Sequence, residues 1–369
     1  MKILHTSDWH LGLEFFGVDP TADQQHMIGE IVRIAREQQV GAVIVAGDVF
    51  DRAVVAPDAI TLYNDAMRAL CLELGLPVVL IAGNHDGAAR LSTLSDLLRG
   101  AGLYIAGRVT TEEMQADLGD TVIHLLPYVY TDDVRQAYPA RREEIACAAD
   151  AMRVVLEERR PPKDGKRHIL AAHCFAAGGQ AGQSDRAAAV GGSLAVPAEW
   201  FSAYDYVALG HLHRPQTLGG GKLRYSGTPM CTSFAETDVP RSVTIVDTND
   251  MSLKEVPVEP LHVMRTLRGT REKLCEGSSQ DYLRLIVTDE FPTAPVQEAL
   301  RRTYPNALQI DCGMQIAASA RTGLTLEEVR ADSPLDVAEK FYLNRTGREM
   351  DDEMRAWFRQ AIEDAEREG

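Results

Sequence analysis

Short apolar runs alternate with helical patterns along the first two thirds of the chain. Six runs have strand length and are rich in aliphatic residues: KILHT (2–6), GAVIVAG (41–47), PVVLIAG (77–83), TVIHLLP (121–127), HILAAH (168–173) and YVALG (206–210). Between the first two, apolar residues from Ile28 to Ala35 have the spacing of one buried helix face. Strands that alternate with amphipathic helices are typical of βαβ units, so the pattern predicts an α/β fold.

Two later runs, LRYSG (223–227) and SVTIVDT (242–248), predict further strands, because Gly-rich or polar turns flank them. We expect antiparallel pairing here, as is usual for strands joined by short turns. The first domain is therefore expected to span residues 1–264 and to consist of layered β-sheet flanked by helices.

A small α/β unit is expected over residues 265–323, where DYLRLIVTDE, APVQEALRRTY and ALQIDCG predict a strand, a helix and a strand. Residues 324–369 are acidic, with helical patterns. Near the C-terminus five apolar residues occur at i, i+3, i+4, i+7 and i+8: Met354, Trp357, Phe358, Ala361 and Ile362. Such a stripe packs onto its own domain or docks onto a partner helix, and the pattern leaves both open.

Composition places the chain among globular proteins, with 45% hydrophobic and 25% charged residues. No stretch approaches the ~20 apolar residues of a membrane helix, and the start, MKILHTSDWH, lacks the apolar core of a signal peptide. We therefore expect a cytoplasmic protein without membrane contact. The six cysteines form no CxxC pair, which argues against both a disulfide framework and a zinc–cysteine site.

The formal net charge of −16 would repel a polyanion unless basic groups gather locally or a partner supplies them. Residues 265–302 are far less acidic than the whole chain, with seven basic and six acidic residues. Unaided binding to nucleic acid is thus not favoured by the total charge.

Side chains of metal-ligand type follow five of the predicted strands. They are Asp8 and His10, Asp48, Asn84 and His85, His173, and His211 and His213. Functional groups gather outside the carboxyl ends of the strands in open α/β sheets, so these residues are expected to meet along one rim. Gly47, Gly83 and Gly210 precede or follow them closely and would permit sharp exits from the strands.

Carboxylates, imidazoles and an amide oxygen suit a divalent ion of intermediate hardness, such as Mn²⁺ or Fe²⁺, with Mg²⁺ as a further candidate. Eight candidate ligands overfill one coordination sphere, so two ions are expected. Asp48 is the expected bridge, because a carboxylate can hold two cations ~3.5–4 Å apart. Any one of these motifs alone could be structural, whereas their order and placement together indicate a metal centre.

The motifs SDWH, GDVFDR, GNHD, AAH and GHLH, in this order, resemble the calcineurin-like metallophosphoesterase family over about the first 240 residues. The longer segments ILHTSDWHLG, VIVAGDVFDR, VLIAGNHD, DYVALGHLHRPQ and YSGTPMCTSF are similar to the bacterial members that process DNA double-strand breaks. The resemblance implies a metal-dependent nuclease, acting as a double-strand exonuclease and a single-strand or hairpin endonuclease in DNA repair and recombination.

The resemblance also implies roles for single residues. One ion would be held by Asp8, His10, Asp48 and His213, and the other by Asp48, Asn84, His173 and His211. His85 would be the catalytic histidine and help to expel the leaving oxygen. Asp51, Arg52 and Arg214 are candidates for substrate contact. Some relatives have a histidine three residues after the bridging aspartate, where this chain has Asp51, so a DNA-positioning role there stays open.

The implied partners are DNA and an ATPase with an SMC-like coiled coil, bound through the C-terminal helices, in a homodimeric, nucleoid-associated assembly. ATP would be the ligand of that partner, since this chain has no GxxxxGK[ST] loop. In the same view, residues 265–323 are a small capping and DNA-binding domain.

Two alternatives remain at this point. The metal centre does not specify the ester, so a phosphatase or a small-substrate phosphodiesterase would have the same ligands. A non-catalytic scaffold of the same fold is the other alternative, and it would have no need of a complete set of ligands.

Overall fold

The computed structural model describes residues 1–181 and 195–313, and within the C-terminal region residues 335–336, 339, 342–343, 350–351 and 354–359. The chain folds as two compact units, Met1–Val263 and Met264–Gly369. Most of the predicted segment 324–369 lies outside the described residues. Among the described residues, no helix has the length and apolar character needed to cross a membrane.

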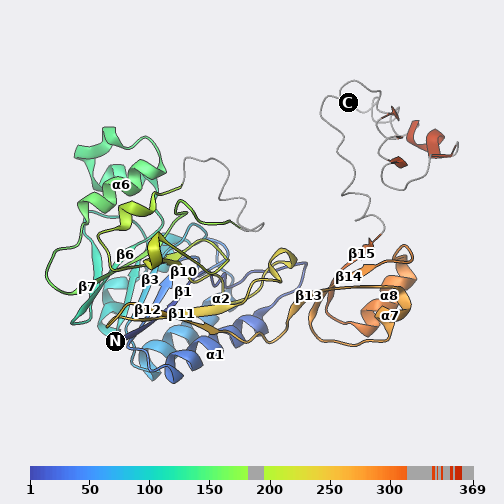
Figure 1. The fold of residues 1–369 in the computed structure, drawn as a ribbon, viewed down its shortest axis with the longest axis horizontal. Coiled ribbons are helices and arrows are strands. Elements are labelled where there is room, and N and C mark those ends of the chain that lie inside the picture. The colour runs from blue at the N-terminus through green and yellow to red at the C-terminus, as the bar shows by residue number, and fades with distance from the viewer. Residues whose placement is uncertain are drawn as a thin grey trace. The chain divides into compact units, whose positions relative to one another are not determined.

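In its described residues, 1–181 and 195–263, the first unit contains two six-stranded sheets. Strands of both sheets are labelled in Figure 1. The first sheet has the order β12-β11-β1-β2-β3-β4, with β1 to β4 parallel and β11 and β12 antiparallel at one side. Its strands are β1 (Lys2–Thr6), β2 (Ala42–Ala46), β3 (Val78–Ile81), β4 (Leu103–Ala106), β11 (Ser242–Asp247) and β12 (Ser252–Pro257). Every residue of β2 and β3 is buried, as their continuous aliphatic runs require of central parallel strands.

The second sheet has the order β5-β6-β7-β8-β10-β9. Its strands are β5 (Met114–Asp117), β6 (Thr121–Leu126), β7 (Arg167–His173), β8 (Tyr206–Gly210), β9 (Gln216–Leu218) and β10 (Leu223–Tyr225). The antiparallel pairing predicted for β10 is wrong on one side, because β10 runs parallel to β8 and antiparallel only to β9. Because β9 and β10 form an antiparallel hairpin, β10 runs in the opposite direction to β9 and in the same direction as β8.

The two sheets pack face to face, and the core between them takes aliphatic side chains from both, including Ile44 and Ile81 from one and Ile123 and Ile169 from the other. A second core lies between the second sheet and α6. The helices are α1 (Thr21–Glu37), α2 (Pro57–Met67), α3 (Ala88–Leu91), α4 (Ser95–Leu98), α5 (Thr131–Ala137) and α6 (Ala148–Glu158), with a π-helical segment over Arg68–Glu73. Short 3-10 turns cover Arg99–Ala101, Pro139–Glu144, Ala198–Phe201, Gly219–Gly221 and Phe234–Glu236.

The structure confirms all six strands predicted first and the apolar face of α1. The predicted face residues of α1 are buried: Ile28, Ile31, Ile34 and Ala35. The layered α/β class is likewise confirmed, although β4, β5, β9 and β12 were not predicted because they are short or alternate with polar residues.

Over residues 264–313, the second unit forms a three-stranded parallel sheet of order β13-β14-β15 with two helices. Its elements are β13 (Met264–Gly269), α7 (Arg271–Cys275), β14 (Tyr282–Val287), α8 (Ala294–Thr303) and β15 (Ala307–Cys312). The predicted strand, helix and strand from β14 to β15 are confirmed. The sequence MRTLRG of β13 escaped prediction because its two arginines and a threonine interrupt the apolar residues.

Part of the predicted apolar stripe near the C-terminus lies in a described helical stretch, 354–359. In that stretch the side chain of Trp357 is 78% exposed. Ala361 and Ile362 lie outside the described residues.

Candidate metal centre

The ligand-type residues leave their strands through strained backbone. Four of them are non-glycine residues with positive φ: Asp8 (53°), His10 (46°), Asp48 (49°) and His211 (103°). Left-handed backbone is unfavourable for such residues and persists only where the surroundings over-determine it. Two backbone hydrogen bonds hold the loop after β1 against the loop after β2. The Asp8 amide donates to the Gly47 carbonyl (2.9 Å), and the His10 amide donates to the Asp48 carbonyl (3.0 Å).

Glycines make room for these loops in two different ways. Of Gly47, Gly83 and Gly210, only Gly47 has a left-handed φ, 89°, as a sharp turn out of the strand requires. A Cβ on Gly83 would overlap the carboxylate of Asp48, and one on Gly210 would overlap the carbonyl oxygen of Ala46. The expectation of sharp exits is therefore wrong for Gly83 and Gly210, which are needed for close approach between loops.

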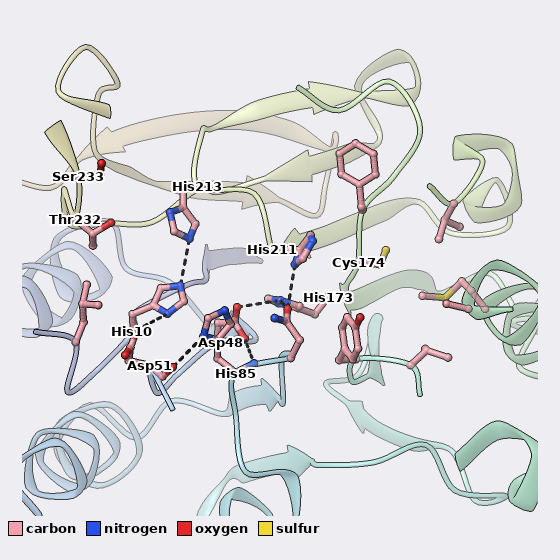
Figure 2. Close-up of a pocket in the computed structure, with 18 residues that line it drawn as sticks. His10, Asp48, Asp51, His85, His173, Cys174, His211, His213, Thr232 and Ser233 are labelled. Atoms are coloured by element: carbon pink, nitrogen blue, oxygen red, sulfur yellow. Dashed lines mark hydrogen bonds and ion pairs between the residues drawn. The ribbon is translucent and has the colours of Figure 1, made fainter. Parts of the chain in front are cut away.

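One group of converging side chains consists of Asp8, His10 and His213, whose ligand atoms all lie within 4.8 Å of one another. Nε2 of His10 lies 3.2 Å from Nε2 of His213 (Figure 2). Asp8 accepts hydrogen bonds from Oγ of Ser7 and, at 3.0 Å, from the amide of His211. The carboxylate of Asp8 is thus fixed by neighbours in two different loops, those after β1 and β8.

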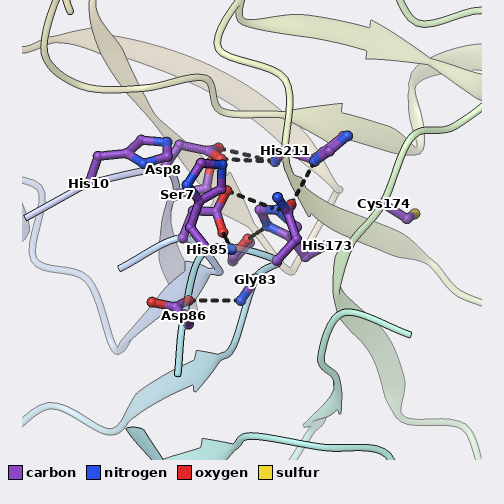
Figure 3. A network of polar contacts seen from close by, with 12 residues as sticks. Ser7, Asp8, His10, Gly83, His85, Asp86, His173, Cys174 and His211 are labelled. Atoms are coloured by element: carbon purple, nitrogen blue, oxygen red, sulfur yellow. Dashed lines mark hydrogen bonds and ion pairs between the residues drawn. The ribbon is translucent and has the colours of Figure 1, made fainter. Parts of the chain in front are cut away.

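A second group surrounds His173, which is completely buried. Its Nε2 lies 3.3 Å from Oδ2 of Asp48 (Figure 2) and 3.1 Å from Oδ1 of Asn84. That amide oxygen also lies 3.1 Å from Nδ1 of His211. Figure 3 shows His173 and His211 in one network of polar contacts with Asp8 and His85. Asp8, Asp48 and His173 form a further group within 4.8 Å, so the two sets adjoin. The structure brings together all seven residues predicted as metal ligands.

The charge states of this cluster follow from burial and mutual contacts. Burial lowers the pKa of His10 and of His211 to about 3 and raises the pKa of Asp8 to about 6. Burial also disfavours a charged His173, but the adjacent carboxylate of Asp48 outweighs it and raises the pKa of His173 to about 9. Against its own burial, Asp48 has a pKa below its usual range because histidines surround it. Cations bind ionised carboxylates and neutral imidazoles, so His173, which carries a proton at neutral pH beside Asp48, would release that proton when an ion binds.

His85 is exposed at the edge of this cluster, with its ring 5.0 Å from that of His10. Its amide donates to Oδ1 of Asp48 at 2.9 Å, and its Nδ1 donates to the carbonyl oxygen of Asp51 at 2.9 Å. Because a carbonyl only accepts, the Nδ1 proton is fixed there. Nε2 remains as the nitrogen that can exchange a proton with a substrate.

The three predicted substrate contacts are placed differently. Asp51 lines the cavity over the cluster, and its Oδ1 lies 3.7 Å from Nδ1 of His10. Arg52 forms an ion pair with Asp51 at 3.2 Å, and Arg214 forms one with Asp238 at 3.3 Å. Neither arginine is among the residues that line the cavity.

The cavity has a volume of about 420 Å³ and extends beyond the ligand cluster. Its apolar side is lined by residues that follow β6 and β7 or belong to α6 and the loop before β8: Tyr128, Val129, Ala148, Met152, Cys174, Phe175 and Val196. Sequence reasoning missed this side, although Tyr128 and Phe175 also follow strand ends and the same rule could have found them.

Two further carboxylates support the cluster and were not predicted. Asp86 accepts hydrogen bonds from the amides of Phe50 (2.9 Å), Val49 (3.2 Å) and Gly83 (2.8 Å), and burial raises its pKa to about 6. These hydrogen bonds connect the loop after β2 to the loop after β3. Asp86 is the last residue of the motif GNHD, so the sequence did offer a signal that could have identified it. Glu236 contacts His213 from the turn η7 (Phe234–Glu236), which no strand-end rule indicates.

Two family models match the chain. The model described as calcineurin-like phosphoesterase matches residues 1–215, more than half of the chain. The model described as type 5 capsule protein repressor C-terminal domain matches residues 260–346. Among curated proteins, the D subunit of the nuclease SbcCD from Staphylococcus epidermidis is 26% identical over 355 residues, which cover 94% of this chain and 94% of that protein.

Solved structures that are similar to this chain include a protein of Thermus thermophilus, 14% identical, with a TM-score of 0.42 over 70% of this chain and 99% of that chain. The phosphoesterase Yfce of E. coli is 14% identical, with a TM-score of 0.28 over 70% of this chain and 100% of that chain.

Proposed function

Because this chain belongs to the calcineurin-like phosphoesterase family, we propose that it is the metal-dependent nuclease subunit of an SbcC–SbcD-type complex and hydrolyses phosphodiester bonds of DNA. The observation that carries the proposal is the convergence of ligand-type side chains from the ends of five strands, β1, β2, β3, β7 and β8. The 26% identity to the D subunit of a nuclease SbcCD, along 94% of the chain, supports a nuclease among the possible phosphoesterases.

The donor atoms fit two divalent ions. Nδ1 of His173 donates to the carbonyl of Ala46 at 2.9 Å, so Nε2 is the nitrogen that faces the oxygens of Asp48 and Asn84 and would bind an ion once its own proton has left. Three electron-rich atoms so close together suit a shared cation. One ion would take Asp8, His10, Asp48 and His213, and the other Asp48, Asn84, His173 and His211.

We propose Mn²⁺ as the ion, with Fe²⁺ and Mg²⁺ as the alternatives to test, because imidazole, carboxylate and amide ligands are mixed here. When bound, the two ions supply an activated nucleophile at neutral pH and offset the charge on the phosphate. Asp51 adds a carboxylate beside His10 and can orient that ring.

His85 would act on the leaving group. The carbonyl of Asp51 holds its Nδ1, and the hydrogen bond from its amide to Asp48 holds its backbone beside the cluster. From there the ring, when Nε2 carries a second proton, can give that proton to the oxygen that departs from phosphorus and keep the Nδ1 proton on the carbonyl of Asp51, as a general acid does. Arg52 is exposed at the same edge, so it can contact a DNA phosphate once its ion pair with Asp51 opens.

The apolar side of the cavity supports a nucleotide substrate over a simple phosphate. A phosphate needs only the ligand cluster and His85, whereas a flat base beside it can lie against Tyr128 and Phe175. The ring of Tyr128 lies 6.2 Å from that of His173, so a base next to a phosphate at the cluster would reach it.

We propose that DNA contacts also come from the second unit and from the partner. Acidic neighbours pair with several basic residues of that unit: Arg265 with Asp281, Arg271 with Glu290, Arg284 with Asp311, and Arg302 with Glu298. Such pairing, with the net charge of −16, argues that this chain binds DNA weakly alone. SbcC, docked on the C-terminal helices, would supply the missing cations.

The proposed assembly is a homodimer of this chain with SbcC, acting on DNA in the nucleoid. The exposed Trp357 fits a helix that docks onto SbcC, the second of the two options for the C-terminal stripe. Exposed Leu94 and Leu97 on and beside α4 are apolar groups of the first unit that a second copy could cover.

The experiment is Mn²⁺-dependent cleavage of linear and hairpin DNA by the purified chain, with and without SbcC, beside a His85→Ala control. Cleavage that the substitution abolishes supports the proposal and the role of His85. Turnover of a small phosphodiester without cleavage of DNA under either condition would instead favour the small-substrate enzyme, the alternative that the acidic total charge supports. If the chain binds no metal and turns over neither substrate, the non-catalytic scaffold is the remaining alternative.

A further inference from the structure

A buried carboxylate lies behind one of the ligand-type histidines. Glu236 ends the turn η7 and is 4% exposed. Its Oε1 lies 3.2 Å from Nδ1 of His213, and its Oε2 accepts a hydrogen bond from Nη2 of Arg241 at 3.1 Å. Nothing in the proposed chemistry assigns it a role.

The contact with Glu236 determines which nitrogen of His213 carries the proton. An ionised carboxylate only accepts hydrogen bonds, so the proton of the neutral ring lies on Nδ1. Nε2 then presents its lone pair to the group formed with Asp8 and His10, where it lies 3.2 Å from Nε2 of His10. The opposite tautomer would direct an N–H into the ligand group and exclude a cation there.

Arg241 in turn fixes the carboxylate. Its Nη2 also donates to the main-chain oxygen of Glu236 at 2.9 Å, and its side chain is only 8% exposed. Within the part of the chain that the structure describes, Nε and Nη1 of Arg241 are buried without a hydrogen-bond partner. A guanidinium only donates, so the atom of residue 236 that faces Arg241 has to be an acceptor.

We propose that Glu236, held by Arg241, is a positioning residue that keeps His213 in the tautomer able to ligate a divalent ion through Nε2. The inference rests on the proposed function and concerns only the ion held by Asp8, His10, Asp48 and His213. Carboxylates behind metal-binding histidines typically change metal affinity by about 10- to 100-fold.

Glu236→Gln tests the proposal, because it keeps the size of the side chain and removes one acceptor. Arg241 needs an acceptor and takes the amide oxygen, so the NH2 group faces Nδ1 of His213 and shifts the ring proton to Nε2. Titration of the metal-free chain with Mn²⁺ in a calorimeter should show two sites in the wild type. In the variant, one site should keep its affinity and the other should weaken about 10- to 100-fold.

A second variant separates this role from a merely structural one. The double variant Glu236→Gln, Arg241→Met has no guanidinium to bind the amide oxygen of residue 236. That oxygen can then accept a hydrogen bond from Nδ1 of His213 again. The double variant should therefore recover Mn²⁺ affinity relative to the single variant. Glu255→Gln is the matched control, since Glu255 pairs with a different arginine, Arg224, and should bind Mn²⁺ like the wild type.

Wild-type Mn²⁺ affinity in Glu236→Gln would overturn the inference. So would weak binding that the double variant does not recover, because loss of structure, and not the tautomer, would then be the cause. The melting temperature of each metal-free variant gives the independent measure of folding. A wild-type chain that binds no Mn²⁺ would contradict the proposed metal centre itself, an outcome distinct from these two.

Discussion

Nδ1 of His173 donates a hydrogen bond to the carbonyl oxygen of Ala46, 127 residues earlier in the chain, at 2.9 Å. Ala46 ends β2 in the first sheet and His173 ends β7 in the second, so this bond joins the carboxyl ends of the two sheets. It also directs the other nitrogen, Nε2, at Asp48 and Asn84. The packing of the sheets and the chemistry of the site are therefore set by the same contact.

Gly210→Ala should disturb this junction. The new Cβ would overlap the carbonyl of Ala46 and lie 2.8 Å from Nδ1 of His173, so the loops must separate. Overpacking of this kind destabilises by about 1–3 kcal/mol, and we expect a lower melting temperature and weaker Mn²⁺ binding in calorimetry. Gly100→Ala is the control, since nothing lies within 4 Å of its Cβ. Equal behaviour of the two variants would show that the close approach at Gly210 is unimportant.

His85→Ala should lower kcat for DNA cleavage by about 10²–10⁴-fold, because it removes the proton donor for the leaving oxygen. Mn²⁺ binding should persist, since the ring of His85 lies outside the seven proposed ligands. Steady-state kinetics and calorimetry measure the two effects separately. A variant that loses both Mn²⁺ sites would assign His85 to the metal centre and not to proton transfer.

Removal of metal should abolish cleavage and lower stability. At a free Mn²⁺ concentration of 100 times Kd, one site adds about 2.7 kcal/mol to the free energy of unfolding, which thermal melting with and without a chelator would detect. Asp48→Asn should largely remove this gain, because Asp48 is the ligand proposed for both ions. An unchanged Mn²⁺-induced shift in melting temperature in that variant would contradict the bridging role.

Phe175→Ala should reduce the preference for an intact base at the scissile nucleotide. Stacking of one base is worth about 1–3 kcal/mol, so the wild type should cleave intact DNA about tenfold more efficiently than DNA with an abasic site there. The variant should discriminate less, as measured by the ratio of the two kcat/KM values. Leu72→Ala, at a residue 68% exposed and outside the cavity, should keep the wild-type ratio. If both variants discriminate alike, the apolar side of the cavity does not hold a base.

His5 should make stability depend on pH. Burial lowers its pKa to about 3, and the neutral ring bonds the Tyr206 hydroxyl (2.8 Å) and the Leu209 carbonyl (3.2 Å). Since its pKa is lower in the folded than in the unfolded chain, its contribution is complete above ~6.5 and declines as pH falls toward 3. Between pH 6.5 and 5 the loss is about 2 kcal/mol.

Urea unfolding of the metal-free chain at several pH values, with His5→Gln beside the wild type, measures this contribution. The variant should show a shallower decline in the free energy of unfolding below pH 6.5. Parallel curves for the two proteins would show that His5 is not a source of the pH dependence.

Much of the fold and the ligand set could be predicted from local sequence. Continuous aliphatic runs such as AVIVA have few alternatives to a buried strand, and each ligand residue lies within four positions of a strand end. Because neighbouring parallel strands align their carboxyl ends, Asp8 and Asp48 could be expected to lie together from the motifs alone, whereas His173 comes from the second sheet.

Tertiary structure alone decided the rest, because it depends on contacts between distant parts of the chain. The sequence does not indicate that Gly83 and Gly210 serve close approach, since that need arises from a neighbouring loop. Nor does it indicate that β10 lies parallel to β8, or that Glu236 and Arg241 lie behind His213. Short sequence motifs identify the types of the ligand residues. The tautomers of the histidines and the distances between the ligands depend instead on how the two sheets pack, because hydrogen bonds between residues more than a hundred positions apart determine them.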